Sequence, residues 1–393
     1  MKTKITLFLL MLFSFYKAQT SPTYLAALTD KWIENSVLDK TTNNLYLCYS
    51  ESGEIKKLNL SNPSAPQVTV LSGLSYPTDA AMVGNKLYFV EATTALDAND
   101  MPIQNTGKLS YIDASQANPS KVTILTNLNI PMKLAAGTDF LIISENNIPA
   151  DPDDFGNQFI SKINLTGTIS KTPIVTRTFT ANNPTDEAFE HFEVLNNNLY
   201  ANSYNTWEVG YFYKIPLDTK IPEVTHSFTQ NSPFTFGIFQ NTYYFGNGSA
   251  PGSSFKTPIG GGVATPISTS FSYNNTGAFF DTWNFDNDGN AYLIIEQSLG
   301  LFLFKYTKQQ LLKTSENAIA QESLNIYPNP TSDVLQFSKP LQEIKVYDKT
   351  GKLVLENKES SQKITVKNLP TGNYFISGKD ILGNKVSAKF IKK

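Results

Sequence analysis

The chain has 393 residues, of which 40% are hydrophobic, so it is long enough and apolar enough for two folded domains. Charged residues make up 17% of the chain and the formal net charge is −2, which argues against a nucleic-acid binder and against an acidic interaction tail. Aromatic residues reach 12%, and together with abundant asparagine, threonine and serine they favour β-strands joined by polar turns.

The first 19 residues have the pattern of a targeting segment. Residues 1–4 form a basic start, residues 5–16 form a short apolar stretch, and the small residue Ala18 follows. The apolar stretch is shorter than the about 20 residues that span a bilayer. We therefore interpret residues 1–19 as a cleaved secretory signal peptide, and we expect no transmembrane segment after its removal.

Cys48 is the only cysteine, so no disulfide forms within the chain and the disulfide-stapled class of small exported domains is excluded. It lies in the apolar run Leu45–Cys48, which predicts a buried and inert thiol. A catalytic cysteine would need a base close by, and the only histidines are His191 and His226.

A two-part phrase recurs six times between residues 43 and 306. Its first part is a pair of the Leu-Tyr type after a turn, and its second part is an alternating stretch such as Gly53–Leu60. The spacings between successive copies are 42, 53, 59, 44 and 48 residues, counted from anchors at Leu45, Leu87, Phe140, Leu199, Tyr243 and Ala291. A period of this length with several short strands per unit predicts one propeller blade per unit.

Each unit is expected to hold four strands, which in the second unit fall at residues 78–83, 86–91, 107–113 and 121–125. The longer gaps at 92–106 and 147–156 are then loops on one face. A β-sandwich does not repeat one hairpin phrase six times, and a β-helix has a far shorter period. We predict an all-β fold with a six-bladed β-propeller over residues 20–307. Five or seven blades are the alternatives, because the first and last units can be shared across a closure.

The phrase "Leu-Tyr … Gly-x-Ile-x-Lys-Ile-Asn-Leu" resembles six-bladed propellers of the NHL, gluconolactonase-like and low-density-lipoprotein-receptor YWTD-like kinds. The resemblance covers roughly residues 25–310 and implies an architecture. The tetrapeptide YWTD is absent from the sequence, and so is any complete enzymatic motif of those families.

The first strand of each propeller blade lines the central channel, and ligands bind where that channel opens. We aligned these strands on the last apolar residue before each turn and counted back two and four positions. This places five ionisable side chains near one end of the channel: Glu34, Asp79, His191, Glu193 and Asp281. Carboxylates with one imidazole suit a divalent metal or a general acid/base pair, and gluconolactonase-like propellers are similar in holding a metal there. The alternative is a set of solvated, inert polar groups.

Residues 286–290, Asp-Asn-Asp-Gly-Asn, carry the alternating oxygen ligands of half a calcium loop, with Asp286 and Asp288 as candidate ligands. The twelfth loop position is Gln297 instead of glutamate, and the same string suits a tight turn, which is the interpretation we prefer. No cofactor is firmly implied, and calcium or another divalent metal is the open alternative.

Two further segments carry weaker signals. Asp151–Asp154 is expected to be a solvated loop, with surface calcium as the alternative. Thr206–Glu208 and Trp283 are expected to pack between blades, with stacking on a sugar ring as the alternative. The sequence contains no nucleophile elbow, His-Glu-x-x-His, phosphate-binding glycine loop or Cys-x-x-Cys, so no common hydrolase or nucleotide-binding chemistry is indicated.

The repeat phrase ends before residues 308–321, which we interpret as a linker with a brief helical stretch. Seven short alternating strands follow in residues 322–393, including 334–337 and 343–348. Turn sequences separate them, and the pattern predicts a small immunoglobulin-like β-sandwich.

Three motifs of this segment resemble the type A C-terminal sorting domain of the type IX secretion system: Tyr327-Pro328-Asn329-Pro330, Ile344 to Lys352 with Gly351, and Leu369 to Tyr374 with Gly372. They come in the family's order down to the basic end of the chain. The resemblance implies export across both membranes of a Gram-negative cell of the Bacteroidota kind. It also implies two partners, the type IX machinery and a surface sortase. An accessory β-sandwich of a secreted protein is the alternative.

Our leading hypothesis is a secreted or surface-attached propeller that binds a glycan or protein ligand through loops on a rigid ring, without catalysis. The second hypothesis is a metal-dependent lactonase-like or other hydrolase with its site at the channel mouth. The third is a structural role in a surface layer.

Overall fold

The computed structural model describes most of the chain, namely residues 21–29, 33–93, 103–147, 157–178, 188–204, 210–228, 233–247, 252–268, 271–273, 276–277, 279–297, 300–312, 326–349, 352–379 and 385–393. The predicted signal peptide therefore lies outside the described residues. The chain divides into two compact units between Thr314 and Ser315.

Most of the first unit consists of antiparallel four-stranded sheets in which each strand pairs with the next one along the chain. Five such sheets are present among the described residues: β2 (Asn35–Asp39), β3 (Asn44–Tyr49), β4 (Glu54–Asn59) and β5 (Val68–Leu71); β6 (Pro77–Val83), β7 (Lys86–Glu91), β8 (Gly107–Asp113) and β9 (Val122–Leu128); β10 (Pro131–Ala136), β11 (Phe140–Asn147), β12 (Asn157–Asn164) and β13 (Ser170–Thr178); β14 (Phe189–Leu195), β15 (Asn198–Tyr204), β16 (Gly210–Pro216) and β17 (Glu223–Phe228); and β18 (Pro233–Phe239), β19 (Thr242–Asn247), β20 (Ser254–Pro258) and β21 (Thr265–Ser268).

A sixth four-stranded sheet joins the two ends of this unit. Three of its strands are consecutive, β24 (Phe279–Phe285), β25 (Ala291–Gln297) and β26 (Gly300–Tyr306), and a short hairpin of β22 (Ser272–Tyr273) and β23 (Thr276–Gly277) precedes them. The fourth strand is β1 (Thr23–Thr29), which comes from the start of the unit and pairs antiparallel with β26. This pairing covers the outer edge of β26, which would otherwise be open to strands of other molecules.

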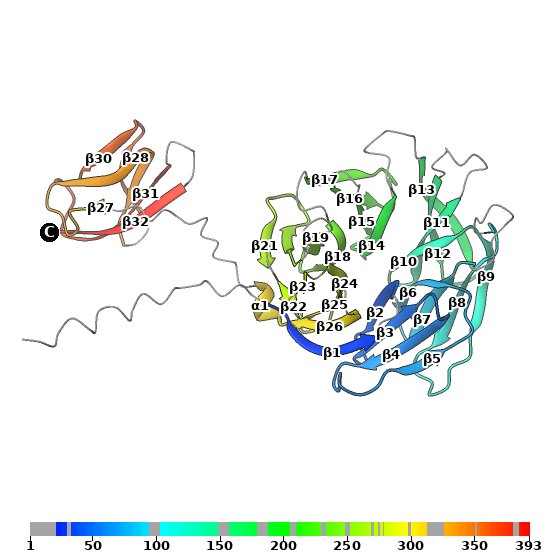
Figure 1. The fold of residues 1–393 in the computed structure, drawn as a ribbon. Coiled ribbons are helices and arrows are strands. Elements are labelled where there is room, and N and C mark those ends of the chain that lie inside the picture. Colours follow the sequence, from blue (N-terminus) through cyan, green and yellow to red (C-terminus); the bar gives the residue numbers. More distant parts are fainter. Residues whose placement is uncertain are drawn as a thin grey trace, which may run out of the picture. The chain divides into compact units, whose positions relative to one another are not determined.

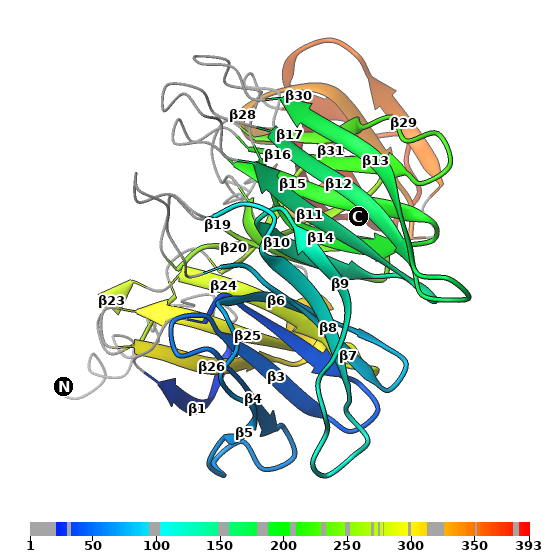
Figure 2. The ribbon, with the colours of Figure 1, turned by 90° about the vertical axis from the view of Figure 1, so that its right-hand side faces the viewer.

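The first strands of successive sheets contact one another in the order β2, β6, β10, β14, β18, β24 and back to β2. Figure 1 shows these strands toward the middle of the first unit, with the later strands of each sheet farther out. Figure 2 shows the sheets from the side, with their strands running next to each other. Repeated four-stranded sheets around a common centre are consistent with a β-propeller.

The burial of the strands explains why the repeat phrase is apolar in its first part. Second strands such as β3 are buried on both faces, because a neighbouring sheet covers each face. Fourth strands lie at the outside, where Val68 of β5 is 55% exposed and Val224 of β17 is 56% exposed. Cys48 of β3 is buried, as predicted, and burial raises the pKa of its thiol well above the ordinary value.

Buried amide side chains join neighbouring sheets. Gln158 of β12 accepts a hydrogen bond from the backbone N of Phe189 at 2.9 Å and donates one to its carbonyl oxygen at 3.1 Å. Asn202 of β15 donates to the carbonyl oxygen of Pro233 at 2.8 Å. Such bonds pair backbone groups that have no partner within their own sheet, so they hold the sheets at fixed positions around the centre.

The helix α1 (Lys308–Leu312) follows β26 and belongs to the first unit. Thr307 and Gln310 exchange hydrogen bonds as a capping box, which satisfies free N–H groups of this short helix. Leu311 is buried in a core cluster of the last sheet. The segment predicted as a linker over 308–321 thus begins with a helix docked on the first unit, and residues 313–325 lie outside the described part.

The second unit contains six strands among its described residues: β27 (Ile326–Tyr327), β28 (Val334–Tyr347), β29 (Leu353–Asn357), β30 (Ser361–Thr365), β31 (Gly372–Lys379) and β32 (Lys385–Lys392). The long strand β28 pairs with β27 and β30 in its first half and with β29 and β31 in its second half. Two of the seven predicted strands, at 334–337 and 343–348, are therefore one continuous strand that serves both halves of the sheet and encloses a single core cluster.

Candidate functional site

A cavity of about 400 Å³ lies in the central channel of the first unit. The first strands of all six four-stranded sheets of the described chain contribute to its lining. Residues of the turns that follow these strands, including Lys40, Gly84 and Gly137, also line it. The cavity therefore extends from the middle of the channel to the face where the first strands end.

Strand pairing defines one ring of equivalent positions in this channel. Each position pairs with the residue three places beyond the first apolar residue of the second strand that is 0% exposed, as Asn35 pairs with Cys48 and Asp79 pairs with Val90. The described members of the ring are all polar: Asn35, Asp79, Lys133, His191 and Thr282. The channel wall thus carries a belt of hydrogen-bonding and charged groups.

This ring corrects the sequence-based alignment at two acidic positions. Asp79 and His191 are members, as predicted, but Glu34 and Asp281 each stand one residue ahead of the true members. A shift of one residue moves a side chain to the other face of a strand. Glu34 accepts hydrogen bonds from Ser50 Oγ at 3.0 Å and from Tyr76 Oη at 3.3 Å, away from the ring. Asp281 lies in β24, and its side chain is outside the described part of the structure.

The error has a physical cause in the lengths of the turns. Val83 pairs with Lys86 directly at a two-residue turn, whereas Leu38 pairs with Leu45 one step before the end of its hairpin. The last apolar residue before the turn therefore stands at a different position of the strand pairing in different sheets, and a fixed count back from it does not reach equivalent residues. β-Bulges in five of the six first strands add to the ambiguity, because each inserts an unpaired residue into the count.

Asp79 is held inside the channel wall. Its side chain accepts hydrogen bonds from Asn35 Nδ2, from the backbone N of Ala80 at 2.6 Å and from the backbone N of Leu134 at 2.8 Å. Burial raises the pKa of this carboxyl to about 6, although the charge of Lys133 and the hydrogen bonds oppose the rise. Because its partners lie on β2, β6 and β10, Asp79 connects three neighbouring sheets.

His191 and Glu193 are two residues apart on β14, so both side chains lie on one face of the strand, and both line the cavity. Within the described structure, neither side chain has a hydrogen-bond partner. Burial lowers the pKa of His191 to about 3, and the charge of Lys133 adds to this effect. Burial raises the pKa of Glu193 to about 7, while Lys40 opposes the rise and Asp79 supports it. At neutral pH the channel thus presents a neutral imidazole next to a carboxyl group that titrates.

The described residues contain no group of three or more histidine, cysteine, aspartate or glutamate side chains that could hold a metal ion. His191 and Glu193 are two single side chains of these types, and the Asp79 carboxylate already accepts hydrogen bonds from backbone and amide donors. The described part of the channel provides hydrogen-bonding groups but no preformed metal site.

Trp283 of β24 lies where the last sheet packs against the fifth sheet. Trp283 is 3% exposed and its ring lies 6.3 Å, centroid to centroid, from that of Tyr244 on β19 of the neighbouring sheet, so the predicted role in packing between blades fits its position. A Cβ atom at Gly237 would lie 2.9 Å from the Cβ atom of Trp283, which explains why the neighbouring strand has a glycine there. Ser36 Oγ donates to Thr282 Oγ1 at 2.8 Å and ties the first sheet to the last.

The acidic turn at 286–290 satisfies its own oxygen atoms. Asp286 accepts hydrogen bonds from the backbone N and the side-chain Nδ2 of Asn290, both at 2.8 Å. Gly289 has a φ of 85°, which is the left-handed conformation that this turn needs. Asn290 Oδ1 in turn accepts a hydrogen bond from the backbone N of Lys308 at the start of α1. This geometry is that of a structural turn, while Asp288 is exposed.

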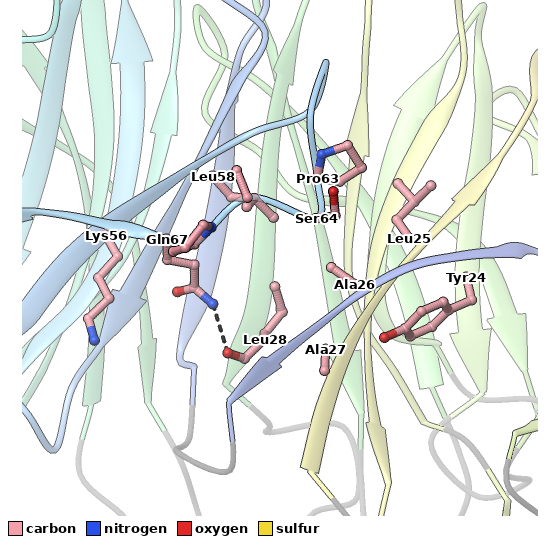
Figure 3. Close-up of a pocket in the computed structure, with 12 residues that line it drawn as sticks. Tyr24, Leu25, Ala26, Ala27, Leu28, Lys56, Leu58, Pro63, Ser64 and Gln67 are labelled. Carbon is pink, nitrogen blue, oxygen red and sulfur yellow. Dashed lines mark hydrogen bonds between the residues drawn. The ribbon is translucent and has the colours of Figure 1, made fainter.

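A second cavity, of about 600 Å³, lies between β1 and the segment from β4 to the loop before β5. Figure 3 shows that its labelled residues come from these two places and that Gln67 points toward β1. Gln67 donates to the carbonyl oxygen of Leu28 at 2.8 Å and accepts from Tyr49 Oη at 2.6 Å. Lys56, its only charged lining residue, is paired with Glu54 at 3.2 Å. We interpret this cavity as the seam where the ends of the first unit meet.

The sorting motif lies at the edge of the second unit. Tyr327, Pro328, Asn329 and Pro330 are exposed, and the Asn329 side chain bonds to the backbone of β32. Gly372 opens β31, where it pairs with Lys392, while Gly351 lies outside the described residues. The segments Asp151–Asp154 and Thr206–Glu208 also lie outside them. No helix in the described ranges is long and apolar enough to span a bilayer.

Comparison with known proteins separates the two units. The sequence profile of the secretion system C-terminal sorting domain matches residues 325–393, which confirms the resemblance of this segment. No curated protein matches the chain.

The fold of the first unit recurs in solved structures. A structural genomics protein of unknown function from Bacteroides thetaiotaomicron is 12% identical, with 73% of this chain and 72% of that chain covered and a TM-score of 0.52. A gluconolactonase from Xanthomonas campestris is 13% identical, with 72% and 91% covered and a TM-score of 0.48. A chain of a nidogen/laminin complex is 12% identical, with 68% and 94% covered and a TM-score of 0.41. At these identities the similarity concerns the fold alone.

Proposed function

Because residues 325–393 are a secretion system C-terminal sorting domain, we propose that this chain is a ligand-binding propeller delivered to the cell exterior by type IX secretion. In this proposal residues 1–19 are a signal peptide, 20–307 a six-bladed propeller, 308–321 a linker and 322–393 an immunoglobulin-like sorting domain. The mature protein is secreted or attached to the outer surface after a sortase has acted on it.

The sorting domain supports the delivery part of this proposal. A domain of this kind is an address for the export machinery, so it gives the first unit a place of action outside the cell. Six four-stranded sheets among the described residues, with the N-terminal strand completing the last one, support a propeller of six blades.

The channel cavity supports the ligand-binding part of the proposal. His191 and Glu193 line about 400 Å³ of space and, in the described structure, form no hydrogen bonds with other protein groups. Cationic Lys40 and Lys133 act on the same groups electrostatically, so charges of both signs face the channel. A neutral ligand rich in hydroxyl or amide groups suits such a surface better than a strongly charged one, and the sugar of a surface glycan has this chemistry.

Removing residues 322–393 tests the delivery part. The truncated protein is expected to accumulate in the periplasm, while the full chain reaches the surface or the medium. Fractionation followed by detection of an internal tag measures the distribution. Surface delivery of the truncated chain would contradict the proposal.

A glycan array and a panel of surface proteins test the binding part. Full-length protein is expected to bind at least one neutral glycan, and His191→Ala and Glu193→Gln are expected to weaken that binding at least tenfold. Glu223→Gln is the matched control, because Glu223 is an exposed residue of the outer strand β17. Absence of binding on both panels would contradict a binding module and favour a structural role in a surface layer.

The alternative is a hydrolase with its site in the same channel. A carboxyl group with a pKa near 7, as burial produces at Glu193, suits a general acid or base at neutral pH. The described residues do not form a complete metal-binding set, so a metal-dependent version needs further ligands. Metal analysis of the purified protein tests it, together with thermal unfolding in Ca²⁺ for wild type, Asp79→Ala and Glu193→Ala. The metal-dependent version fails if no ion is retained and Ca²⁺ leaves all three melting temperatures unchanged.

A further inference from the structure

The outer face of the hairpin β31–β32 in the second unit carries large apolar side chains. Tyr374, Ile376 and Phe390 point into the core, and the residues that alternate with them along β31 and β32 point outward. Two of these outward residues are large and apolar, since Phe375 is 51% exposed and Ile391 is 44% exposed. Exposed apolar side chains on a strand face are costly in water unless something covers them.

Strand register extends this face across the sheet. Phe375 pairs with Tyr347 of β28 on one side and with Lys389 of β32 on the other. Tyr347 in turn pairs with Leu353 of β29, which is 43% exposed. The row of Leu353, Tyr347, Phe375 and the diagonal neighbour Ile391 therefore crosses four strands, and none of these residues belongs to the core cluster. We call this row the outer strip; Figures 1 and 2 show the strands that carry it.

Charge distinguishes this unit from the rest of the chain. Residues 325–393 hold 12 of the 32 basic residues and 6 of the 34 acidic ones, so their formal net charge is +6 and that of the remaining residues is −8. Lys389 pairs with Phe375 at the side of the outer strip, and Lys393 after β32 and Lys352 before β29 flank the strip. An apolar strip among lysines is complementary to an apolar surface that carries carboxylates.

The sorting motif directly holds the strand that completes the strip. Asn329 Nδ2 donates to the carbonyl oxygen of Lys389 at 3.0 Å, and Asn329 Oδ1 accepts from the backbone N of Ile391 at 2.9 Å. Thr331 continues this pairing, because its N donates to the carbonyl oxygen of Ile391 at 2.9 Å and its carbonyl oxygen accepts from Lys393 N at 2.8 Å. Asn329 and the adjacent Thr331 thus hold the backbone of β32 at Lys389 and Ile391.

From these observations we infer that the outer strip is the surface through which the sorting domain docks on a protein of the export machinery, and that the docking surface of this partner is apolar and acidic. The inference rests on the proposed delivery by type IX secretion and adds the face and the chemistry of the contact. The basic excess of the unit argues for an acidic partner, and the link between the sorting motif and β32 argues for a partner that recognises this particular face.

The test is export of the full chain carrying Phe375→Ser with Ile391→Ser, or Lys389→Glu alone. All three side chains point to solvent, so these variants are expected to fold, which circular dichroism and thermal unfolding of the purified proteins check. Export is expected to fall about tenfold or more for each variant, because central apolar and charged contacts dominate binding energy. Lys363→Glu, an exposed lysine of β30 in the other half of the sheet, is the matched control and is expected to be exported normally.

The outcomes separate this inference from the proposed delivery. Export without residues 322–393 would overturn both. Trapping of the truncated chain together with normal export of folded strip variants would overturn the inference alone. If the Phe375→Ser, Ile391→Ser double variant misfolds, export of Lys389→Glu still tests the inference, because this variant changes a single exposed residue. Binding of the purified wild-type chain to lipopolysaccharide vesicles that the strip variants lose would assign the face to a membrane surface and also overturn a protein partner.

Discussion

His191 and Glu193 face the same channel, and burial moves their pKa values in opposite directions, to about 3 and about 7. Both shifts disfavour charge in a confined space, so neither side chain gains from ionisation when the protein folds. A protein that only needed stability would place apolar residues there. Polar groups kept in a cavity at a cost in stability are therefore a reason to regard this channel as a binding site.

Glu193→Gln should stabilise the folded protein above neutral pH. The folded pKa of Glu193 is raised above its ordinary value of 4.5, so the penalty for its charge is absent below pH 4.5, grows as the pH rises toward 7 and is constant above. The variant is expected to be more stable than wild type by about 2 kcal/mol at pH 8, after allowance for screening by channel water, and equally stable at pH 4. Urea unfolding at both pH values measures this, and a difference independent of pH would contradict it.

Asp79→Ala should destabilise the first unit more than Asp79→Asn. The alanine leaves three donors on β2, β6 and β10 without an acceptor in a buried place, which is expected to cost about 2–3 kcal/mol. Asparagine keeps one acceptor oxygen and a similar shape, so its cost is expected to be about half as large. Chemical denaturation of both variants provides the comparison. Equal effects would mean that Asp79 does not connect the sheets.

At the level of elements, the strand β1 has a task that its sequence does not reveal. It pairs with β26 from the opposite end of the unit, with Ala26 opposite Leu303 and Ala27 opposite Phe302. The repeat phrase predicted four-stranded units, but β1 carries no copy of it. Its role as the last strand of the final sheet depends on where the two ends meet in space.

A chain that starts at residue 30 should therefore lose much of the stability of the first unit. Without β1, the edge of β26 and the apolar side chains beside it become exposed to water. The melting temperature is expected to fall by about 10 °C or more relative to a chain that starts at residue 20. Differential scanning calorimetry of the two proteins is the measurement, and identical melting temperatures would show that β1 does not contribute to closure.

The sorting motif offers a second prediction at this level. Asn329→Ala removes two hydrogen bonds to the backbone of β32, so the second unit is expected to lose about 1–2 kcal/mol of stability. The amide of Ile391 is expected to exchange faster with deuterium, while amides in the core of β31 change less. Unchanged protection of Ile391 would show that Asn329 does not hold the last strand. Lys363→Ala, at an exposed position of β30, provides a control that leaves both bonds in place.

At the level of the whole molecule, the two units have separate cores. The core cluster of the second unit contains only residues from 335 to 390, and the clusters of the first unit contain none of them. Two separate cores are expected to unfold independently. This division agrees with the match of the sorting-domain profile to the second unit alone.

Calorimetry of the full chain should accordingly show two transitions. A chain that ends at Thr314 is expected to reproduce one of them at an unchanged temperature, because no core residue is removed. Asp79→Ala should shift that transition only, and Asn329→Ala the other. A single transition that disappears on truncation would contradict independent units.

Several features could be predicted from the sequence because they are local. The repeat period, the turn at 286–290, the buried Cys48 and the sorting motif each depend on residues that are neighbours in the chain or recur at a fixed distance. Hydrophobic alternation then predicts strands, and the number of similar phrases predicts the number of similar sheets. Asp79 and His191 both fall in the ring of equivalent positions because their strands end at turns of the same length.

Only the tertiary structure decided which side chains meet. Turn lengths and bulges shift the register by one residue, so Asn35 and Thr282 occupy ring positions where the sequence alignment had placed Glu34 and Asp281. The partner of β1 and the exposed side of β31 and β32 likewise depend on contacts between residues far apart in the chain. The sequence alone therefore determined the sorting motif and the repeat of four-stranded units in this protein. The composition of its channel and of the outer strip was decided by long-range strand pairing, whose register cannot be predicted from local sequence patterns.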